Sequence, residues 1–193
     1  MTKPLDLVHT DVMGPFEVES VGKAHYAVLF IDDCMKFFSV YVIRHKSDVA
    51  DVFREYKREA ETLHRRTIGM VRSDNGGEYT SQAFIDICKE TGMMQQFTSP
   101  GTPEENRTAE RGVRSLTELM RANLLQAKLP RSFWSFAIKY AAYTKNCVWT
   151  KKMGKMSPAE AWYGKKPSLD LMRTFGCKVF VRNNPASDQK LTD

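Results

Sequence analysis

The sequence has few cysteines and no long apolar run. Its four histidines form no pair with zinc-ligand spacing, and its four cysteines lie far apart, at positions 34, 88, 147 and 177. Widely spaced thiols argue against a disulfide scaffold or a structural zinc site and fit reduced core residues of an intracellular protein. No segment reaches the roughly 18 apolar residues that cross a bilayer, and the first residues lack a signal-peptide layout, so we expect no membrane partner.

The composition is that of an ordinary globular protein with a basic balance. Hydrophobic residues make up 42% and charged residues 27% of the 193 positions, and no repeat or low-complexity tract interrupts them. We expect a core domain over residues 1–150, with a basic linker and C-terminal extension over 151–193. The 29 Lys and Arg residues exceed the 23 acids by six. This balance suits a polyanionic partner such as nucleic acid, although many basic proteins bind none.

Apolar patterning predicts an α/β fold. Alternating or β-branched runs predict strands at 5–12, 25–31, 37–43, 67–73, 93–98 and 175–181. Helical spacing predicts helices at 47–64, 82–91, 104–127, 132–149 and 158–163. Ser81 and Gly92 are typical cap residues for the second helix, and Ser47 or Asp48 for the first. The order predicts a mixed five-stranded sheet flanked by helices, with a further C-terminal helical and extended segment.

Three acids stand out because each comes from a different element. Asp11 lies on the first predicted strand, Asp74 follows the fourth, and Glu110 lies on the long helix. Carboxylate oxygens on rigid elements at one sheet edge suit Mg²⁺ or Mn²⁺, which would offset their mutual repulsion. The alternative is a structural role, since Asp74 followed by Asn-Gly-Gly is also an ordinary turn sequence.

Three motifs carry a family resemblance. HTDVMGPF (9–16), VRSDNGGEYTS (71–81) and SPGTPEENRTAER (99–111) closely resemble signature regions of copia-type LTR retrotransposon integrases, and the likeness runs from about Leu5 to Cys177. The resemblance implies an RNase H-like fold and a D,D-35-E triad of Asp11, Asp74 and Glu110, the last two separated by 35 residues. It also implies two-metal chemistry with Mg²⁺ or Mn²⁺.

That resemblance further implies what the protein does and where. The expected activity is metal-dependent processing of DNA 3′ ends, followed by strand transfer of element DNA into target DNA. Double-stranded DNA and further copies of the chain, as a dimer or larger homo-oligomer, are the expected partners. Nuclear localisation with a cytoplasmic particle stage is expected, and the chain would be part of a longer polyprotein or a short gene product.

The third motif departs from the family. Such integrases usually have Gln-Gln-Asn-Gly where this chain has Glu104, Glu105, Asn106 and Arg107. Arginine adds bulk and charge one turn before Glu110, and extra acids oppose phosphate binding. A catalytically decayed or host-recruited DNA-binding or interaction protein is therefore an alternative function, and a ribonuclease H-type nuclease is a third.

Other polar residues have two interpretations each. Candidate DNA contacts are Asn106, Arg111, Arg114, Lys151 and Lys152. Their alternative is a solvated helix face, with ion pairs such as Arg114 with Glu118, and a solvated basic link. We interpret Asp32 and Asp33 as hairpin-turn residues. Glu78 is interpreted as a loop acid, with orientation of the metal site as the lesser alternative.

Overall fold

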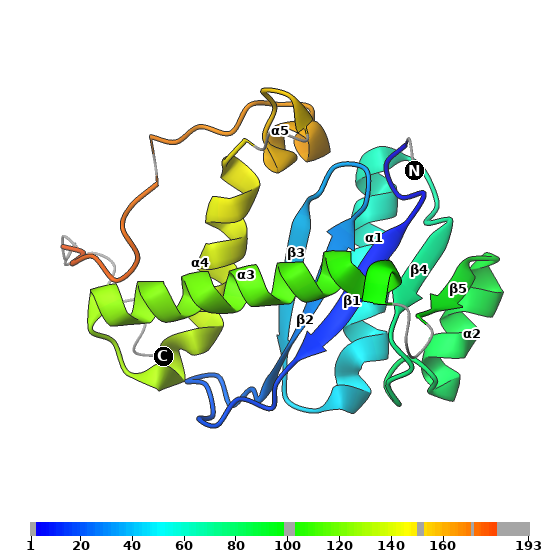
Figure 1. Ribbon diagram of the computed structural model, residues 1–193, viewed down its shortest axis with the longest axis horizontal. Coiled ribbons are helices and arrows are strands. Elements are labelled where there is room, and N and C mark those ends of the chain that lie inside the picture. Colours follow the sequence, from blue (N-terminus) through cyan, green and yellow to red (C-terminus); the bar gives the residue numbers. More distant parts are fainter. Residues whose placement is uncertain (1–2, 99–102, 150–152, 171, 181–193) are drawn as a thin grey trace, which may run out of the picture.

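A mixed sheet forms the centre of the molecule (Figure 1). The computed structural model describes residues 3–98, 103–149, 153–170 and 172–180, with the side chains of 103–106 excepted. Within that part of the chain the sheet has five strands: β1 (Val8–Met13), β2 (Tyr26–Asp32), β3 (Phe38–Ile43), β4 (Met70–Ser73) and β5 (Met94–Phe97). Their order is β3-β2-β1-β4-β5. β1, β2 and β3 pair antiparallel, whereas β4 and β5 run parallel to β1, which confirms the predicted mixed sheet.

Helices cover both faces of this sheet. The helices are α1 (Val49–His64), α2 (Gln82–Thr91), α3 (Pro103–Ala127), α4 (Trp134–Cys147) and α5 (Pro158–Tyr163), with 3₁₀ turns η1 (Lys46–Asp48) and η2 (Arg131–Phe133). α3 crosses one face and α1 lies behind the sheet (Figure 1). Ser81 caps α2 by accepting from the Phe84 N–H, and Gly92 ends it in the left-handed conformation, both as predicted. Asp48 precedes α1 but makes no side-chain cap, because its carboxylate accepts from the His45 N–H.

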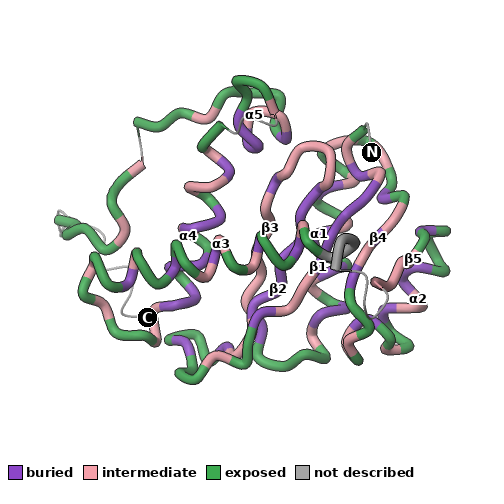
Figure 2. The backbone as a smooth tube through the Cα atoms, viewed as in Figure 1, coloured by how far each residue is buried: buried purple, intermediate pink, exposed green. Residues whose placement is uncertain are grey.

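Alternation along the central strands separates two apolar cores. On β2, Val28 and Phe30 belong to the core under α1 and α2, whereas Leu29 and Ile31 belong to the core under α3 and α4. Figure 2 shows the buried strands between exposed outer helix faces. On β1, Val8 belongs to the first core and Met13 to the second. Because successive strand residues face opposite sides, the odd-numbered residues of β1 face α3.

A glycine brings α3 close to the sheet. A Cβ built on Gly112 would lie 2.5 Å from Ile31 Cδ1, 3.1 Å from Leu29 Cδ2 and 3.2 Å from Phe38 Cε1. A methyl group in that space would displace buried side chains or the helix. Gly112 therefore sets the distance between α3 and strands β2 and β3.

The C-terminal segment packs back on the core as a helix and an extended stretch. The Trp162 ring of α5 stacks on Phe37 with centroids 4.7 Å apart. Further along, the Phe175 ring contacts Tyr140 of α4 at 5.5 Å. The predicted strand at 175–181 is wrong over 175–180, where the structure has a turn and extended chain instead of a strand. Phe175 docks on a helix, and the sheet order, which ends at β3 and β5, gives the segment no partner strand. The division near residue 150 stays a prediction.

Candidate active site

Asp11 lies near the middle of the sheet on the α3 side. It pairs with Leu29 across β1 and β2 and shares the odd-numbered face of β1 with Met13. Its Oδ1 accepts a hydrogen bond from the Val12 N–H at 2.8 Å. The residue is half-buried, so its carboxylate is fixed by a buried strand and still reaches the surface.

Asp74 follows β4, the strand beside β1. Ser73 at the end of β4 is fully buried, whereas Asp74 is exposed. The Asp74 Oδ1 accepts from the Gly76 N–H at 3.0 Å, which is a turn closed by the aspartate side chain. The ordinary turn role is therefore present, and the parallel pairing of β4 with β1 places this turn beside the strand that carries Asp11.

Glu110 comes to the same region on α3, which contacts β1 and β2. Its neighbour Ala109 is completely buried, and Gly112 contacts the sheet two residues later, so the helix presents Glu110 at the edge of its buried face. Glu110 itself is exposed. The apolar pattern of the long helix predicted that Glu110 lies beside the row of buried apolar residues and not within it.

Electrostatics link the three acids. Burial raises the pKa of Asp11 to about 6, and the charge of Asp74 adds to the rise. Glu110 and Glu78 raise the pKa of Asp11 further, while the hydrogen bond from Val12 opposes the increase. Like charges act in this way only over short distances in a partly desolvated setting. The fold has thus brought residues from β1, the turn after β4 and α3 into one electrostatic cluster.

The side chains are not closed into a metal-binding arrangement. The part of the chain that the structure describes contains no group of three His, Cys, Asp or Glu side chains positioned to hold an ion. Repulsion explains part of the spread, since two carboxylates about 5 Å apart repel by roughly 3 kcal/mol at an effective dielectric near 20. The donor set still fits Mg²⁺ or Mn²⁺, because all three groups offer carboxylate oxygens and the negative charges of Asp74 and Glu110 act on Asp11.

A fourth carboxylate, Glu78, lies beside Asp74. A Cβ built on Gly76 would meet Glu78 Oε2 at 2.9 Å and Asp74 Oδ1 at 3.0 Å, so both groups touch the same small space. The Glu78 side chain is only 6% exposed, and its Oε1 lies 3.1 Å from the Lys46 Nζ of η1. Sequence reasoning interpreted Glu78 as a loop acid, with orientation of the metal site as the lesser alternative, and did not consider Lys46. The position of Glu78 four residues after Asp74, across two glycines, was the available signal.

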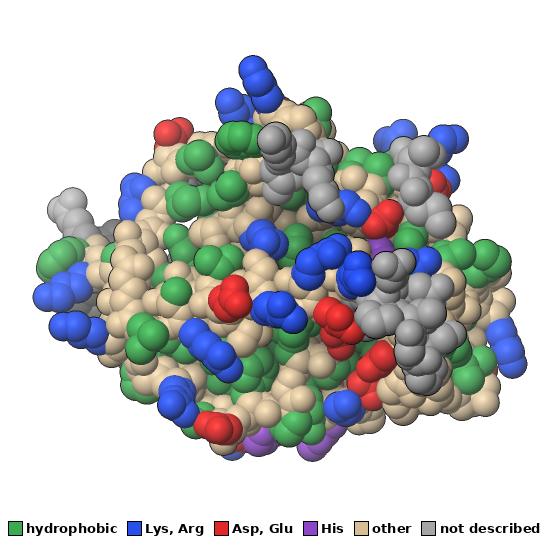
Figure 3. All heavy atoms as spheres, viewed as in Figure 1, with side chains coloured by type: hydrophobic (Ala, Val, Ile, Leu, Met, Phe, Trp, Pro, Cys, Tyr) green, Lys and Arg blue, Asp and Glu red, His purple; other side chains and the backbone are tan. Residues whose placement is uncertain are grey.

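The candidate DNA contacts divide into those that the structure places and those that it does not. Arg111 and Arg114 are exposed on α3. Lys and Arg side chains lie along α3 with acids between them (Figure 3). Lys151, Lys152 and the side chain of Asn106 lie outside the described residues. Two arginines of the predicted set therefore stand on the helix that carries Glu110.

Sequence reasoning also missed a half-buried lysine between α3 and α4. Lys145 Nζ donates to Ser115 Oγ at 2.8 Å and lies 5.1 Å above the Phe38 ring centroid. Burial lowers the pKa of Lys145. Its position at the end of a helix rich in aromatic residues gave no distinguishing signal.

The turn after β2 is structural, as interpreted from the sequence. Asp32 is fully buried and accepts from the Leu5 N–H at 2.8 Å and the Met35 N–H at 2.6 Å. Asp33 Oδ1 lies 3.0 Å from His9 Nε2 and 2.7 Å from Lys36 Nζ. These bonds hold the pKa of Asp33 below its usual range, with the His9 bond contributing most. Both aspartates are thus committed to holding the hairpin.

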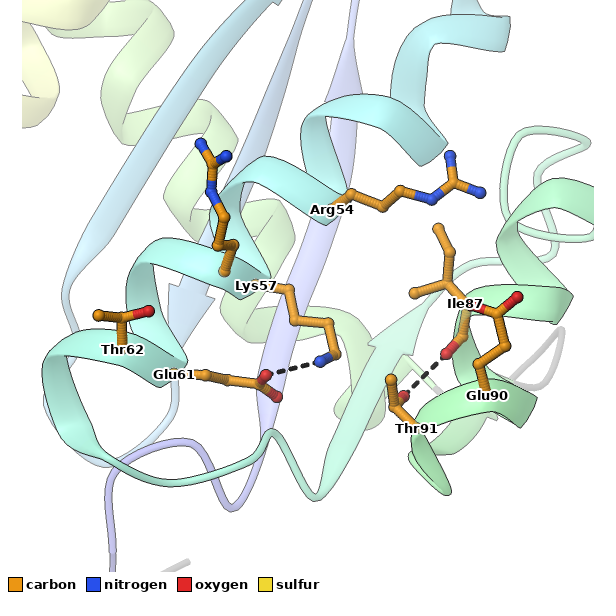
Figure 4. Close-up of a pocket in the computed structure, with 8 residues that line it drawn as sticks. Arg54, Lys57, Glu61, Thr62, Ile87, Glu90 and Thr91 are labelled. Atoms are coloured by element: carbon orange, nitrogen blue, oxygen red, sulfur yellow. Dashed lines mark hydrogen bonds and ion pairs between the residues drawn. The ribbon is translucent and has the colours of Figure 1, made fainter.

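A charged groove of about 510 Å³ lies between α1 and α2, away from the acid cluster. Figure 4 shows Lys57 bonded to Glu61 and the Thr91 hydroxyl bonded to the Ile87 carbonyl, with Arg54 and Glu90 at the sides. The helices that form this groove pack on the α1 and α2 core, whereas Asp11 faces α3. None of the three clustered acids lines this groove.

Comparison with known proteins identifies the family. Residues 1–103 match the integrase core domain family, a span that includes Asp11 and Asp74 and ends before Glu110. The chain belongs to the integrase core domain family. This integrase core is similar to the retrovirus-related Pol polyprotein of transposon TNT 1-94 from Nicotiana tabacum, with 39% identity over 98% of the chain. It is also similar to that of transposon RE2 from Arabidopsis thaliana, with 30% identity over 100% of the chain. The predicted copia-type resemblance is confirmed.

The integrase core spans only a small part of these relatives. It covers 14% of the TNT 1-94 polyprotein and 13% of the RE2 polyprotein. The activities of those whole proteins therefore do not transfer to it directly.

Solved structures establish the fold. The HTLV-2 integrase catalytic core domain in complex with magnesium, in a trimeric form, matches with a TM-score of 0.60 and 17% identity, over 82% of this chain and 97% of that one. A simian T-cell lymphotropic virus intasome in complex with PP2A regulatory subunit B56 gamma matches with a TM-score of 0.66 and 15% identity, over 94% and 61%. At these identities the likeness concerns the fold, and the expected RNase H-like architecture is confirmed.

Proposed function

We propose that this integrase core catalyses metal-dependent processing of DNA 3′ ends and their transfer into target DNA. The observation that carries the proposal is the electrostatic cluster of Asp11, Asp74 and Glu110, drawn from three elements of an integrase fold. Burial and the neighbouring acids raise the pKa of Asp11, and a carboxylate held in such a disfavoured ionised state indicates that the site has a functional use for it. A cation-binding centre beside a phosphate backbone is such a use.

The three acids would hold Mg²⁺ or Mn²⁺. Asp11, the most buried, would lie between the other two, with Asp74 and Glu110 on either side. When bound, divalent ions would activate the attacking hydroxyl and stabilise the leaving oxygen of an in-line displacement at phosphorus. The chain's own part is to fix the carboxylates: β1 holds Asp11, the turn to Gly76 holds Asp74, and α3 holds Glu110.

Double-stranded DNA, as element ends and as target, is the proposed substrate. Arg111 and Arg114 would contact phosphates beside the acids, because both are exposed on α3 close to Glu110. Asn106, Lys151 and Lys152 remain proposed contacts on sequence grounds.

Assembly into a homo-oligomer and a nuclear location are proposed as well. The HTLV-2 integrase catalytic core domain has structures in a trimeric and a dimeric form, and the simian viral structure is an intasome. No helix in the described residues is long and apolar enough to cross a membrane.

The test is an Asp74→Asn variant in a strand-transfer assay with Mg²⁺ or Mn²⁺ and duplexes carrying the ends of the parent element. Loss of one oxygen ligand should reduce joining by on the order of 100-fold or more. Asp51→Asn is the matched control, because Asp51 is 80% exposed on α1 and pairs with Arg54. Joining that survives in Asp74→Asn at wild-type protein levels contradicts the assignment. A wild-type protein that binds DNA but joins none, with no metal bound, supports the decayed or host-recruited alternative instead.

A further inference from the structure

The Lys46–Glu78 ion pair lies against the proposed metal site without belonging to the three acids. The Lys46 Nζ lies 3.1 Å from Glu78 Oε1. Glu78 has its other oxygen beside Gly76, the same glycine whose N–H holds Asp74. One carboxylate therefore separates the Lys46 ammonium from Asp74.

The backbone around Glu78 is firmly held, so the carboxylate has a fixed place. The Tyr79 N–H donates to the Gly76 carbonyl at 3.0 Å, and the Tyr79 carbonyl accepts from Gln95 Nε2 at 2.7 Å. The Tyr79 side chain is fully buried, with its hydroxyl 2.9 Å from Thr10 Oγ1 on β1. The Ser81 hydroxyl donates to the Glu78 carbonyl at 2.9 Å. Glu78 is thus anchored from β1, β5 and α2 together.

Lys46 is held differently. Its side chain is 48% exposed, whereas that of Glu78 is 6% exposed. A lysine ammonium on a flexible four-carbon stem can follow whichever anion is nearest. Without Glu78, the ammonium would face Asp74, because Asp74 Oδ1 and Glu78 Oε2 border the same small space beside Gly76. A lysine paired with Asp74 would compete directly with a divalent ion for the same oxygen atoms.

We propose that Glu78 is a positioning residue that holds Lys46 away from the metal-binding carboxylates. This inference rests on the proposed function and deepens it. The fixed, buried carboxylate engages the mobile cation, and Asp74 stays available to metal. Glu78 is not a ligand in this scheme; it acts through Lys46.

The experiment measures Mn²⁺ affinity by calorimetry, without DNA, for wild type, Lys46→Met, Glu78→Gln and the double variant. Glu78→Gln is expected to weaken binding by at least about fivefold, because Lys46 then pairs with Asp74. Removing Lys46 should strengthen binding at most about twofold when Glu78 is present, and at least about fivefold when Glu78 is replaced. This unequal effect of one substitution in two backgrounds is the signature of the proposal.

Two results overturn it. If removing Lys46 changes the Mn²⁺ affinity equally with Glu78 present and with Glu78→Gln, the charges of Lys46 and Glu78 act on the metal site independently of each other. If the double variant binds as weakly as Glu78→Gln, Glu78 is itself a ligand. Should Lys46→Met fail to unfold cooperatively, Lys46→Gln takes its place in the same cycle. A wild-type protein that binds no Mn²⁺ contradicts the proposed function, whereas measurable wild-type affinity with equal Lys46 effects contradicts this inference alone.

Discussion

At the scale of single residues, the fold disfavours the ionised form of Asp11. Burial and the neighbouring Asp74 charge raise its pKa from 3.8 to about 6. As the pH increases, Asp11 therefore loses its carboxyl proton at a lower pH in the unfolded chain than in the folded protein. The folded state loses stability between pH 3.8 and about 6, and the loss is complete at neutral pH.

Replacing Asp11 by Asn should therefore stabilise the metal-free protein at neutral pH. Asn keeps an oxygen for the Val12 N–H and removes the disfavoured charge. The expected gain is roughly 1–3 kcal/mol in the free energy of unfolding at about pH 7.5, and only about 0.5 kcal/mol at about pH 4, where Asp11 is protonated in the folded state and about half ionised in the unfolded state. Urea unfolding in EDTA at both pH values measures it. A variant whose gain does not grow with pH contradicts the raised pKa, and Asp51→Asn is the control.

At the scale of elements, the close approach of α3 to the sheet decides where Glu110 lies. Gly112 permits this approach, because a Cβ atom at residue 112 would lie only 2.5 Å from Ile31 Cδ1. Helix propensity alone disfavours a glycine in mid-helix by about 1 kcal/mol, so the packing provides its reason. The same contact fixes the distance of α3, the helix that carries Glu110, from β2 and β3.

Gly112→Leu should push α3 away from the sheet. Overpacking of this kind costs roughly 1–3 kcal/mol in stability. Strand transfer should fall further than the folded fraction does, because Glu110 moves with the helix. Thermal unfolding and the joining assay on the same preparations separate the two effects, with Glu118→Leu on the exposed face of α3 as control. Wild-type joining by a folded Gly112→Leu protein would show that this contact does not place Glu110.

Strands and helices were largely predictable from the sequence, since period and caps are local properties. Ser81 and Gly92 bound α2 as expected. The segment at 175–180 was mistaken for a strand because its apolar residues do not share one environment: Phe175 docks on α4, whereas Val179 and Phe180 are exposed, and local pattern does not reveal this. The contact between Lys46 and Glu78 spans 32 residues, so only the folded chain shows it.

At the scale of the whole molecule, the fold explains why distant acids meet. β1 and β4 are neighbours in space although 56 residues lie between the end of one and the start of the other. Their parallel pairing puts Asp74 beside the strand that carries Asp11, and α3 returns across the same face (Figure 1). The positions of the three acids on different predicted elements suggested a metal site. The family resemblance was needed to single out these three among the 23 acids of the chain. The net charge of +6 would favour association of the chain with the proposed DNA substrate.

The most direct measurement is a crystal structure of the protein soaked in Mn²⁺, with anomalous scattering used to locate the metal. The account predicts at least one manganese peak with Asp11 and Asp74 oxygen atoms within roughly 2–2.5 Å, and Glu110 turned toward it. Saturating Mn²⁺ that binds elsewhere, or leaves these carboxylates apart as they now stand, would contradict a metal-dependent integrase site.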